Sequence, residues 1–337
     1  MIKSIRSILS VALLLLASSS SAQEQDSPPV EFRTISENLF EILGGRGART
    51  GVYIGDNGVL LIDSKMDKNS VDQVIEGIVK ITDKPVRYLV NTHSDGDHVA
   101  GNRYLPKTVT FIAHENCRKE FFGLDRGGKP SEWNAPELLP FVPSITFRDK
   151  METYLGSKKV ELWHLGIGHT TGDAVVYFPQ EKTAFIGDQI FLGRPQLIHS
   201  YKGGNSFDHV KTLTRMLETI GAERFCSGHN EVTDRAAIKN HIAQMKQKQE
   251  KVRQLLKEGK NLEQVIRILV NSCAVSILYG RSSIAAPRSI DSRPRRKLGT
   301  GRRSHDRRGC SGSDCGDKAT IVPPDSVPGC TAAGATT

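Results

Sequence analysis

The chain has 337 residues, of which 38% are hydrophobic and 25% charged, which is enough to bury a large core in one or two domains. The formal net charge is +9, but residues 281–337 hold 11 Lys and Arg against five Asp and so account for +6 of it. The first 280 residues therefore carry only +3. This balance gives no reason to expect a nucleic-acid partner.

The first 22 residues have the order of a secretory signal peptide. Lys3 and Arg6 precede an apolar run over residues 8–17, and small residues follow as far as Ala22. The run is half as long as the roughly 20 residues of a membrane-spanning helix, and no later segment is apolar enough to span a bilayer. We expect cleavage near Ala22 and a periplasmic or secreted protein. An uncleaved membrane anchor is the alternative.

Strands and helices alternate in the first half of the domain that we predict over residues 23–270. The expected strands are at residues 30–35, 38–44 and 86–90. Residues 51–64 predict a hairpin that turns at Asp56-Asn57-Gly58, because this tripeptide favours tight turns. Apolar residues at helical spacing predict a helix over 70–82. Residues 109–122 predict a short strand and a helix, and 122–143, rich in Gly and Pro, a long surface loop.

The second half of the predicted domain also combines short strands with helices. Short apolar runs predict strands at residues 159–166, 173–179, 182–188 and 223–228, and amphipathic or charged periodicity predicts helices at 206–221 and 234–258. Two halves that each place strands before helices indicate an α/β (α+β) fold, in which two sheets pack together with helices outside.

Residues 271–337 differ in character from the rest of the chain. A helical pattern over 261–269 gives way to basic, Gly- and Ser-rich sequence with almost no large apolar residues and no helical or strand period. This composition predicts a disordered tail, and its abrupt onset is typical of an unconstrained or out-of-frame extension. A nucleic-acid-binding arm, or a zinc or disulfide site at its three cysteines, is the alternative.

One polar loop carries the main chemical signal. "NTHSDGDHVAGN" (91–102) follows the predicted strand 86–90 and places His93, Asp95, Asp97 and His98 within six positions. His and Asp are poor strand formers and good metal ligands. Three more such residues stand beside glycine at strand ends: His169, Asp188 and His229. Seven His and Asp side chains at the ends of four strands predict a two-metal site.

This pattern resembles the metallo-β-lactamase superfamily, whose usual motif is His-x-His-x-Asp-His followed by a distant His, a bridging Asp and a last His. The resemblance covers roughly residues 30–260 and implies a four-layer αβ/βα sandwich. It implies that His93, Asp95 and His169 hold a first metal and that Asp97, His98 and His229 hold a second. Asp188 would bridge the two metals. Asp63, after the early strand pair, would orient the metal loop.

The departure from the motif is Asp95, where the family usually has His. A site of two imidazoles and two carboxylates suits Fe or Mn as well as Zn, and the extra anion would make the metal pair less electrophilic. We expect two divalent ions, most simply zinc, in an exported hydrolase of modest rate. An iron-dependent oxidoreductase or oxygen-handling protein is the alternative, and a non-catalytic binding protein a second one.

The expected reaction is attack by a metal-bound hydroxide on a lactam, ester or thioester, with Asp97 steering the proton. Two loops beside the metals would select a small-molecule substrate. Residues 122–143 supply Trp133, and residues 189–205, which include Arg194 and His199, supply Lys202, which could bind a substrate carboxylate. The other histidines outside the tail are expected to be structural. The oligomeric state stays open.

Overall fold

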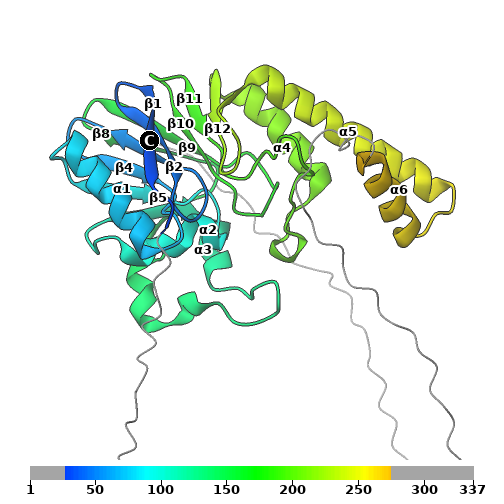
Figure 1. The fold of residues 1–337 in the computed structure, drawn as a ribbon, viewed down its shortest axis with the longest axis horizontal. Helices are drawn as coiled ribbons and strands as arrows, with labels where there is room; N and C mark the ends of the chain where they lie inside the picture. The colour runs from blue at the N-terminus through cyan, green and yellow to red at the C-terminus, as the bar shows by residue number, and fades with distance from the viewer. Residues whose placement is uncertain (1–26, 275–337) are drawn as a thin grey trace, which may run out of the picture. The chain divides into compact units, whose positions relative to one another are not determined.

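The computed structural model describes residues 27–274, all of which belong to one compact unit (Figure 1). The predicted signal peptide, and the predicted tail from residue 275 onward, lie outside the described residues. Within 27–274, no helix is both long and apolar enough to cross a membrane.

The first sheet has seven strands in sequence order. They are β1 (Val30–Ser36), β2 (Leu39–Gly44), β3 (Thr50–Ile54), β4 (Val59–Ile62), β5 (Val86–Val90), β6 (Thr110–His114) and β7 (Ile145–Phe147). Neighbours from β1 to β4 are antiparallel, and those from β4 to β7 are parallel. The β3–β4 pair confirms the predicted hairpin. All four residues of β4 are buried, as expected of a strand covered on both faces.

The second sheet has six strands in the order β13-β12-β11-β10-β9-β8. These are β8 (Lys150–Leu155), β9 (Lys158–Trp163), β10 (Val175–Phe178), β11 (Thr183–Phe185), β12 (Arg224–Cys226) and β13 (Thr233–Asp234). Only β11 and β12 are parallel to each other, so their carboxyl ends emerge at the same edge.

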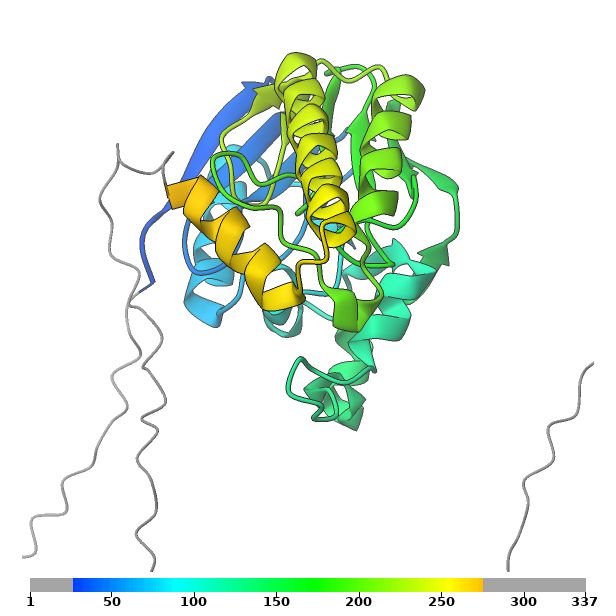
Figure 2. The same cartoon turned by 90° about the vertical axis from the view of Figure 1, so that its right-hand side faces the viewer.

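Helices cover the outer faces of the two sheets (Figures 1 and 2). They are α1 (Lys68–Ile81), α3 (Glu115–Phe121), α4 (Ser206–Thr219) and α5 (Arg235–Lys257). The short helix α2 (Gly96–Val99) follows β5, and α6 (Leu262–Ala274) contacts α5. Buried side chains of α1 and α3 pack with the first sheet, and those of α4 and α5 pack with the second. A third apolar cluster joins both sheets, for example Leu60 and Ile62 with Phe178 and Phe185. This arrangement is the predicted αβ/βα sandwich.

The structure corrects the prediction of a long surface loop over 122–143. This segment contains the 3₁₀ helices η2 (Glu132–Asn134) and η3 (Pro136–Phe141), and Trp133 and Phe141 are buried. Trp133 packs edge-on against Phe121, with ring centroids 5.1 Å apart. Aromatic burial of this kind outweighs the Gly- and Pro-rich composition of the segment.

Further short elements were not expected from the sequence. They are the strands β7, β8 and β13, the helix α2 within the predicted polar loop, and the 3₁₀ helices η1 (Ala100–Tyr104) and η4 (Ser200–Lys202). β7, β8 and β13 lie at sheet edges, and β7 and β13 have only three and two residues, too few to show a period. The expected domain boundary at residue 270 falls inside α6, which continues to Ala274.

Candidate metal centre

The seven predicted ligand residues come together at the edge of the sandwich where parallel strands end. His93 and Asp95 follow β5, and Asp97 and His98 lie in α2. His169 lies in the β9–β10 connection, Asp188 follows β11 and His229 follows β12. The side chains form two groups with ligand atoms within 4.8 Å of one another, namely His93, Asp95, His169 and Asp188, and Asp97, His98 and His229.

In the first group, the imidazoles converge on two carboxylates. Asp95 Oδ2 lies 3.0 Å from His169 Nε2 and 3.5 Å from His93 Nε2. Asp188 Oδ2 lies 3.9 Å from the Nε2 atoms of both histidines. His93, His169 and Asp188 are buried, and the side chain of Asp95 is 11% exposed.

The second group shares Asp188 with the first. Asp188 Oδ1 lies 3.2 Å from His98 Nε2, and its Oδ2 lies 3.3 Å from His229 Nε2. Asp97 Oδ2 lies 3.1 Å from His229 Nε2 and 3.7 Å from His98 Nε2. Asp188 is therefore the residue that reaches both groups, in the position that a bridging carboxylate would take.

Glycine is required beside two of these residues. A Cβ on Gly187 would approach Thr92 Oγ1 to 2.5 Å, and Gly187 has φ +50°. A Cβ on Gly228 would come within 2.5 Å of Asp188 Oδ1 and 2.6 Å of His98 Cε1. The glycines that precede Asp188 and His229 thus let the chain pass directly against the centre.

Hydrogen bonds at Nδ1 fix the orientation of three imidazoles. Asp63 accepts from His98 Nδ1 at 2.7 Å and from the Thr92 hydroxyl at 2.8 Å. The Thr92 oxygen can then accept from His93 Nδ1, 3.0 Å away, and the Leu197 carbonyl accepts from His169 Nδ1 at 3.0 Å. Because each Nδ1 has its own hydrogen-bond acceptor, Nε2 is the atom of each ring that faces the centre and could bind a metal after losing its proton.

Several buried polar atoms of the centre have no hydrogen-bond partner among the described residues. They are Nε2 of His93, Nε2 of His98 and Oδ1 of Asp188; the last two lie 3.2 Å apart but not in hydrogen-bonding geometry. Unpaired buried atoms of this kind are costly and need an explanation. Two cations, one bound by each group, would satisfy all three.

The pKa shifts of the carboxylates and imidazoles also indicate a site suited to cations. Burial would raise the pKa of Asp188, but His98 and His229 hold that pKa well below its usual range. Burial likewise opposes the charged form of His169, yet the hydrogen bond to Asp95 raises the His169 pKa to about 9. Hydrogen bonds to Asp188 and Asp97 raise the pKa of His229 to about 9. Protons on the imidazoles thus balance the carboxylates, and divalent ions could take their place.

Two side chains contact Asp95 that the sequence analysis did not place beside it: His199, named there as a loop residue, and Lys202, predicted as a substrate-binding residue. His199 Nε2 lies 2.7 Å from Asp95 Oδ2, and Lys202 Nζ lies 2.6 Å from Asp95 Oδ1. Lys202 was expected to meet a substrate carboxylate, and the structure places it on a carboxylate of the protein. More than 100 positions separate Asp95 from these partners, so no local pattern could have revealed the contacts.

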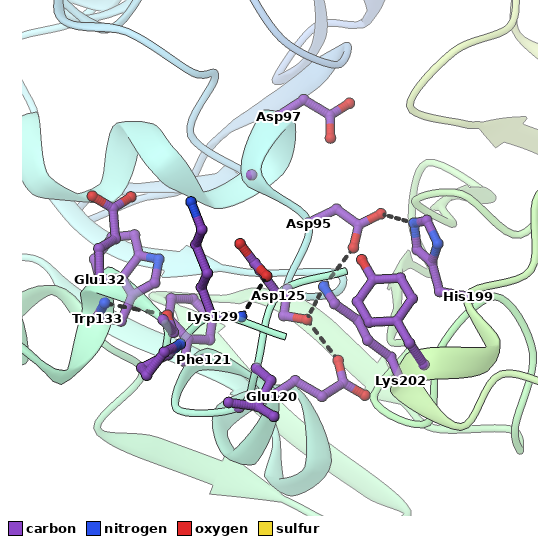
Figure 3. Close-up of a pocket in the computed structure, with 17 residues that line it drawn as sticks. Asp95, Asp97, Glu120, Phe121, Asp125, Lys129, Glu132, Trp133, His199 and Lys202 are labelled. Atoms are coloured by element: carbon purple, nitrogen blue, oxygen red, sulfur yellow. Dashed lines mark hydrogen bonds and ion pairs between the residues drawn. The ribbon is translucent and has the colours of Figure 1, made fainter. Parts of the chain in front are cut away.

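A cavity of about 570 Å³ opens beside the centre (Figure 3). Asp95, Asp97, His199 and Lys202 line one side, and the segment after α3, including Lys129, Glu132 and Trp133, lines the other. The predicted substrate residue Trp133 borders this cavity but is only 6% exposed. It therefore offers an edge to a ligand while most of the ring supports the wall.

Comparison with known proteins gives a consistent picture. A family model described as the metallo-beta-lactamase superfamily matches residues 43–229. A "Metallo-beta-lactamase type 2" of Elizabethkingia meningoseptica is 23% identical over 67% of this chain and 89% of its own length. "Hydroxyacylglutathione hydrolase" of Pelagibacter ubique is 26% identical over 46% of this chain and 61% of its own.

Two further matches differ in their coverage. The "2,4-dinitroanisole O-demethylase subunit alpha" of Nocardioides sp. is 26% identical over 48% of this chain, and the match spans less than half, 44%, of its own length. Among solved structures, a metallo-beta-lactamase from Pontibacter korlensis superposes with a TM-score of 0.55 at 18% identity, covering 64% of this chain and 99% of its own. At that identity the likeness concerns the fold alone.

Proposed function

Because the chain belongs to the metallo-beta-lactamase superfamily, we propose that it is an exported, metal-dependent hydrolase of small lactam, ester or thioester substrates. The observation that carries this proposal is the pair of His/Asp groups that both contact Asp188 and that contain buried Nε2 atoms without a hydrogen-bond partner. The relatives named as a lactamase and a hydrolase support the reaction class.

The residues present fit two divalent ions. His93, Asp95 and His169 would hold one, Asp97, His98 and His229 the other, and Asp188 would contact both. Imidazole and carboxylate donors in this mixture suit zinc and also accept iron or manganese. When bound, such ions lower the pKa of water from 15.7 to about 7 and so supply hydroxide near neutral pH.

Asp97 has the position of a proton acceptor in this reaction. Its side chain is 33% exposed and lines the cavity, while its Oδ2 contacts His229. Burial would raise the Asp97 pKa, but the hydrogen bond from His229 and the charge of His98 lower it below its usual range. Asp97 is thus an anion that faces both the cavity and the centre, and it can orient an attacking water molecule.

Metal analysis combined with activity tests this proposal. The protein should be purified without added metal, analysed for bound elements, and assayed with neutral lactams, esters and thioesters. An aryl methyl ether belongs in the panel because the name of one relative refers to 2,4-dinitroanisole. About two zinc ions per chain and cleavage of at least one class are expected. Tightly bound iron with little zinc and no hydrolysis would favour the oxidoreductase alternative, which the mixed donor set also permits.

Export is a separate part of the proposal, supported by the order of basic, apolar and small residues over 1–22. Expression of the full chain in a Gram-negative host, followed by fractionation and N-terminal sequencing, tests it. We expect a periplasmic product that begins near residue 23. Full-length protein that stays in the membrane fraction would instead identify an uncleaved anchor.

A further inference from the structure

Lys202 is a lysine of the cavity wall that contacts the candidate metal ligand Asp95, as His199 also does. Its Nζ lies 2.6 Å from Asp95 Oδ1 and donates to Ser94 Oγ at 2.8 Å. The side chains of Lys202 and Asp95 are only 13% and 11% exposed. Water screens such a pair poorly, so the two charges interact strongly. Lys202 is therefore bound to the protein's own carboxylate before a substrate arrives.

A second carboxylate lies behind this pair. The Ser94 hydroxyl that accepts from Lys202 donates to Glu120 Oε2 at 2.6 Å, and Thr171 Oγ1 donates to Glu120 Oε1 at 2.7 Å. An anionic group that approached Lys202 would thus meet Asp95 and, beyond Ser94, Glu120. Like charges brought together in a partly buried space are strongly disfavoured.

The other charged residues that line the cavity do not create a replacement anion site. Asp97, Asp125 and Glu132 are acidic, and Glu132 is paired with Arg103 at 2.6 Å. Lys129 is the second lysine of the lining, on the opposite side from Lys202 (Figure 3). Lys129 is exposed, and an exposed lysine attracts an anion only weakly because water and salt screen its charge.

We propose that the Asp95–Lys202 pair sets the charge preference of the site, so that it accepts substrates whose group next to the scissile bond is neutral or cationic and discriminates against anionic ones. This inference rests on the proposed hydrolase function. The residue at position 95 is decisive, because a neutral side chain there would leave Lys202 free to bind a carboxylate.

Three thioesters with the same acyl group provide the test. Butyrylthiocholine is cationic, S-butyryl-N-acetylcysteamine is neutral, and S-butyryl-3-mercaptopropionate is anionic. We expect kcat/KM of the zinc-loaded enzyme to be at least ~10-fold lower for the anionic substrate than for the neutral one. Asp95→Asn should remove most of this discrimination, and adding Lys202→Met to Asp95→Asn should restore it. Lys129→Met is the matched control and should change the ratio less than about 2-fold.

Lys202→Met alone gives the result that could overturn the proposal. We expect it to preserve or increase the discrimination, since Asp95 then loses one of its cationic partners and the cavity loses an ammonium that could bind an anion. A selective loss of activity on the anionic substrate would instead show that Lys202 binds substrate carboxylates in the native enzyme. Equal kcat/KM for all three substrates would also refute the proposal.

Calorimetric titration with glutarate separates this inference from the hydrolase function. If zinc is bound but no substrate in the thioester, ester and lactam panel is cleaved, the proposed function fails, and the titration still decides the inference. Asp95→Asn should bind glutarate at least ~10-fold more tightly than the native protein, and the double variant should lose that gain. Equal affinities across the three proteins would contradict the proposed role of the pair. Metal content is measured for every variant.

Discussion

Asp63 is expected to control metal affinity without contacting a metal. Its carboxylate is 4% exposed and accepts three hydrogen bonds, from the Thr92 amide and hydroxyl and from His98 Nδ1, at 2.7–2.8 Å. Through the Thr92 hydroxyl it also sets the orientation of His93. One carboxylate thus aligns an imidazole of each proposed metal site, and Asp63→Asn is the smallest change that disturbs both.

The magnitude follows from the hydrogen bonds that an amide can make. If the Asn oxygen faces His98, its NH₂ group opposes the Thr92 amide, and an unpaired buried donor costs about 1–3 kcal/mol. If the NH₂ group faces His98 instead, that histidine must carry its proton on Nε2, the atom that points at Asp188. We expect the unfolding free energy of the metal-free protein to fall by about 2–4 kcal/mol and metal affinity to fall about 10–100-fold.

Asp67→Asn is the matched control for this substitution. Asp67 also accepts from a backbone amide and a hydroxyl, those of Ser70 and Ser27, but it caps α1 and touches no histidine of the centre. Asn caps helices as well as Asp does, so this variant should bind metal like the native protein. The assays are urea unfolding of the metal-free proteins and competition for zinc against a chromophoric chelator. Asp63→Asn with native zinc affinity would refute the reasoning.

Three further predictions concern other parts of the same structure. Asp188→Ala should remove most bound zinc from both proposed sites, as elemental analysis would show, because Asp188 is the residue that both groups share; retention of zinc at either site would contradict the shared role. Lys65→Met should lower stability by about 2–4 kcal/mol, since the buried Lys65 ammonium donates to three backbone carbonyls and unpaired buried acceptors are costly. Burial lowers the Lys65 pKa to about 8, so between pH 8 and 10.5 the unfolded chain binds more protons than the folded chain. The unfolding free energy of the native protein should therefore rise by about 3 kcal/mol over this pH range relative to that of Lys65→Met. A difference in urea unfolding that does not depend on pH would contradict this. Trp133→Ala should destabilise by about 3 kcal/mol, because the ring packs on Phe121 and beneath Arg103, and a variant of native stability with a raised KM would identify Trp133 as a substrate residue alone.

The fold was predictable because its strongest signals are local. Helical periodicity predicted α1 and α4, and a charged helical pattern predicted α5, each within a few residues of its observed ends, and the Asp56-Asn57-Gly58 turn predicted the β3–β4 hairpin. The edge strand β8 was missed, because only two of its six residues, Thr153 and Leu155, are buried. Burial of Trp133 was missed for a related reason, since its partners Phe121 and Arg103 come from other segments.

The candidate metal residues were recognisable as a set because each stands at a strand end or beside a glycine, which is a property of the local sequence. Their orientation was only partly predictable. Asp63 was expected to support the centre, whereas the Thr92 hydroxyl that relays its effect to His93 carries no sequence signal. Side-chain relays depend on rotamers and on distances across the sheet, which a one-dimensional pattern does not encode.

Asp95 shows how this difference changes a chemical argument. From the sequence alone, a carboxylate in place of a neutral imidazole adds one negative charge to the site. That extra charge led us to expect a less electrophilic metal pair and a hydrolase of modest rate. The structure places the Lys202 ammonium 2.6 Å from the same carboxylate, so the added charge is offset within the site. Opposite charges this close and this buried interact strongly. The Asp95 carboxylate (−1) and the Lys202 ammonium (+1) sum to zero, which is also the charge of a neutral imidazole. The replacement of His by Asp is therefore no reason by itself to expect a weak hydrolase.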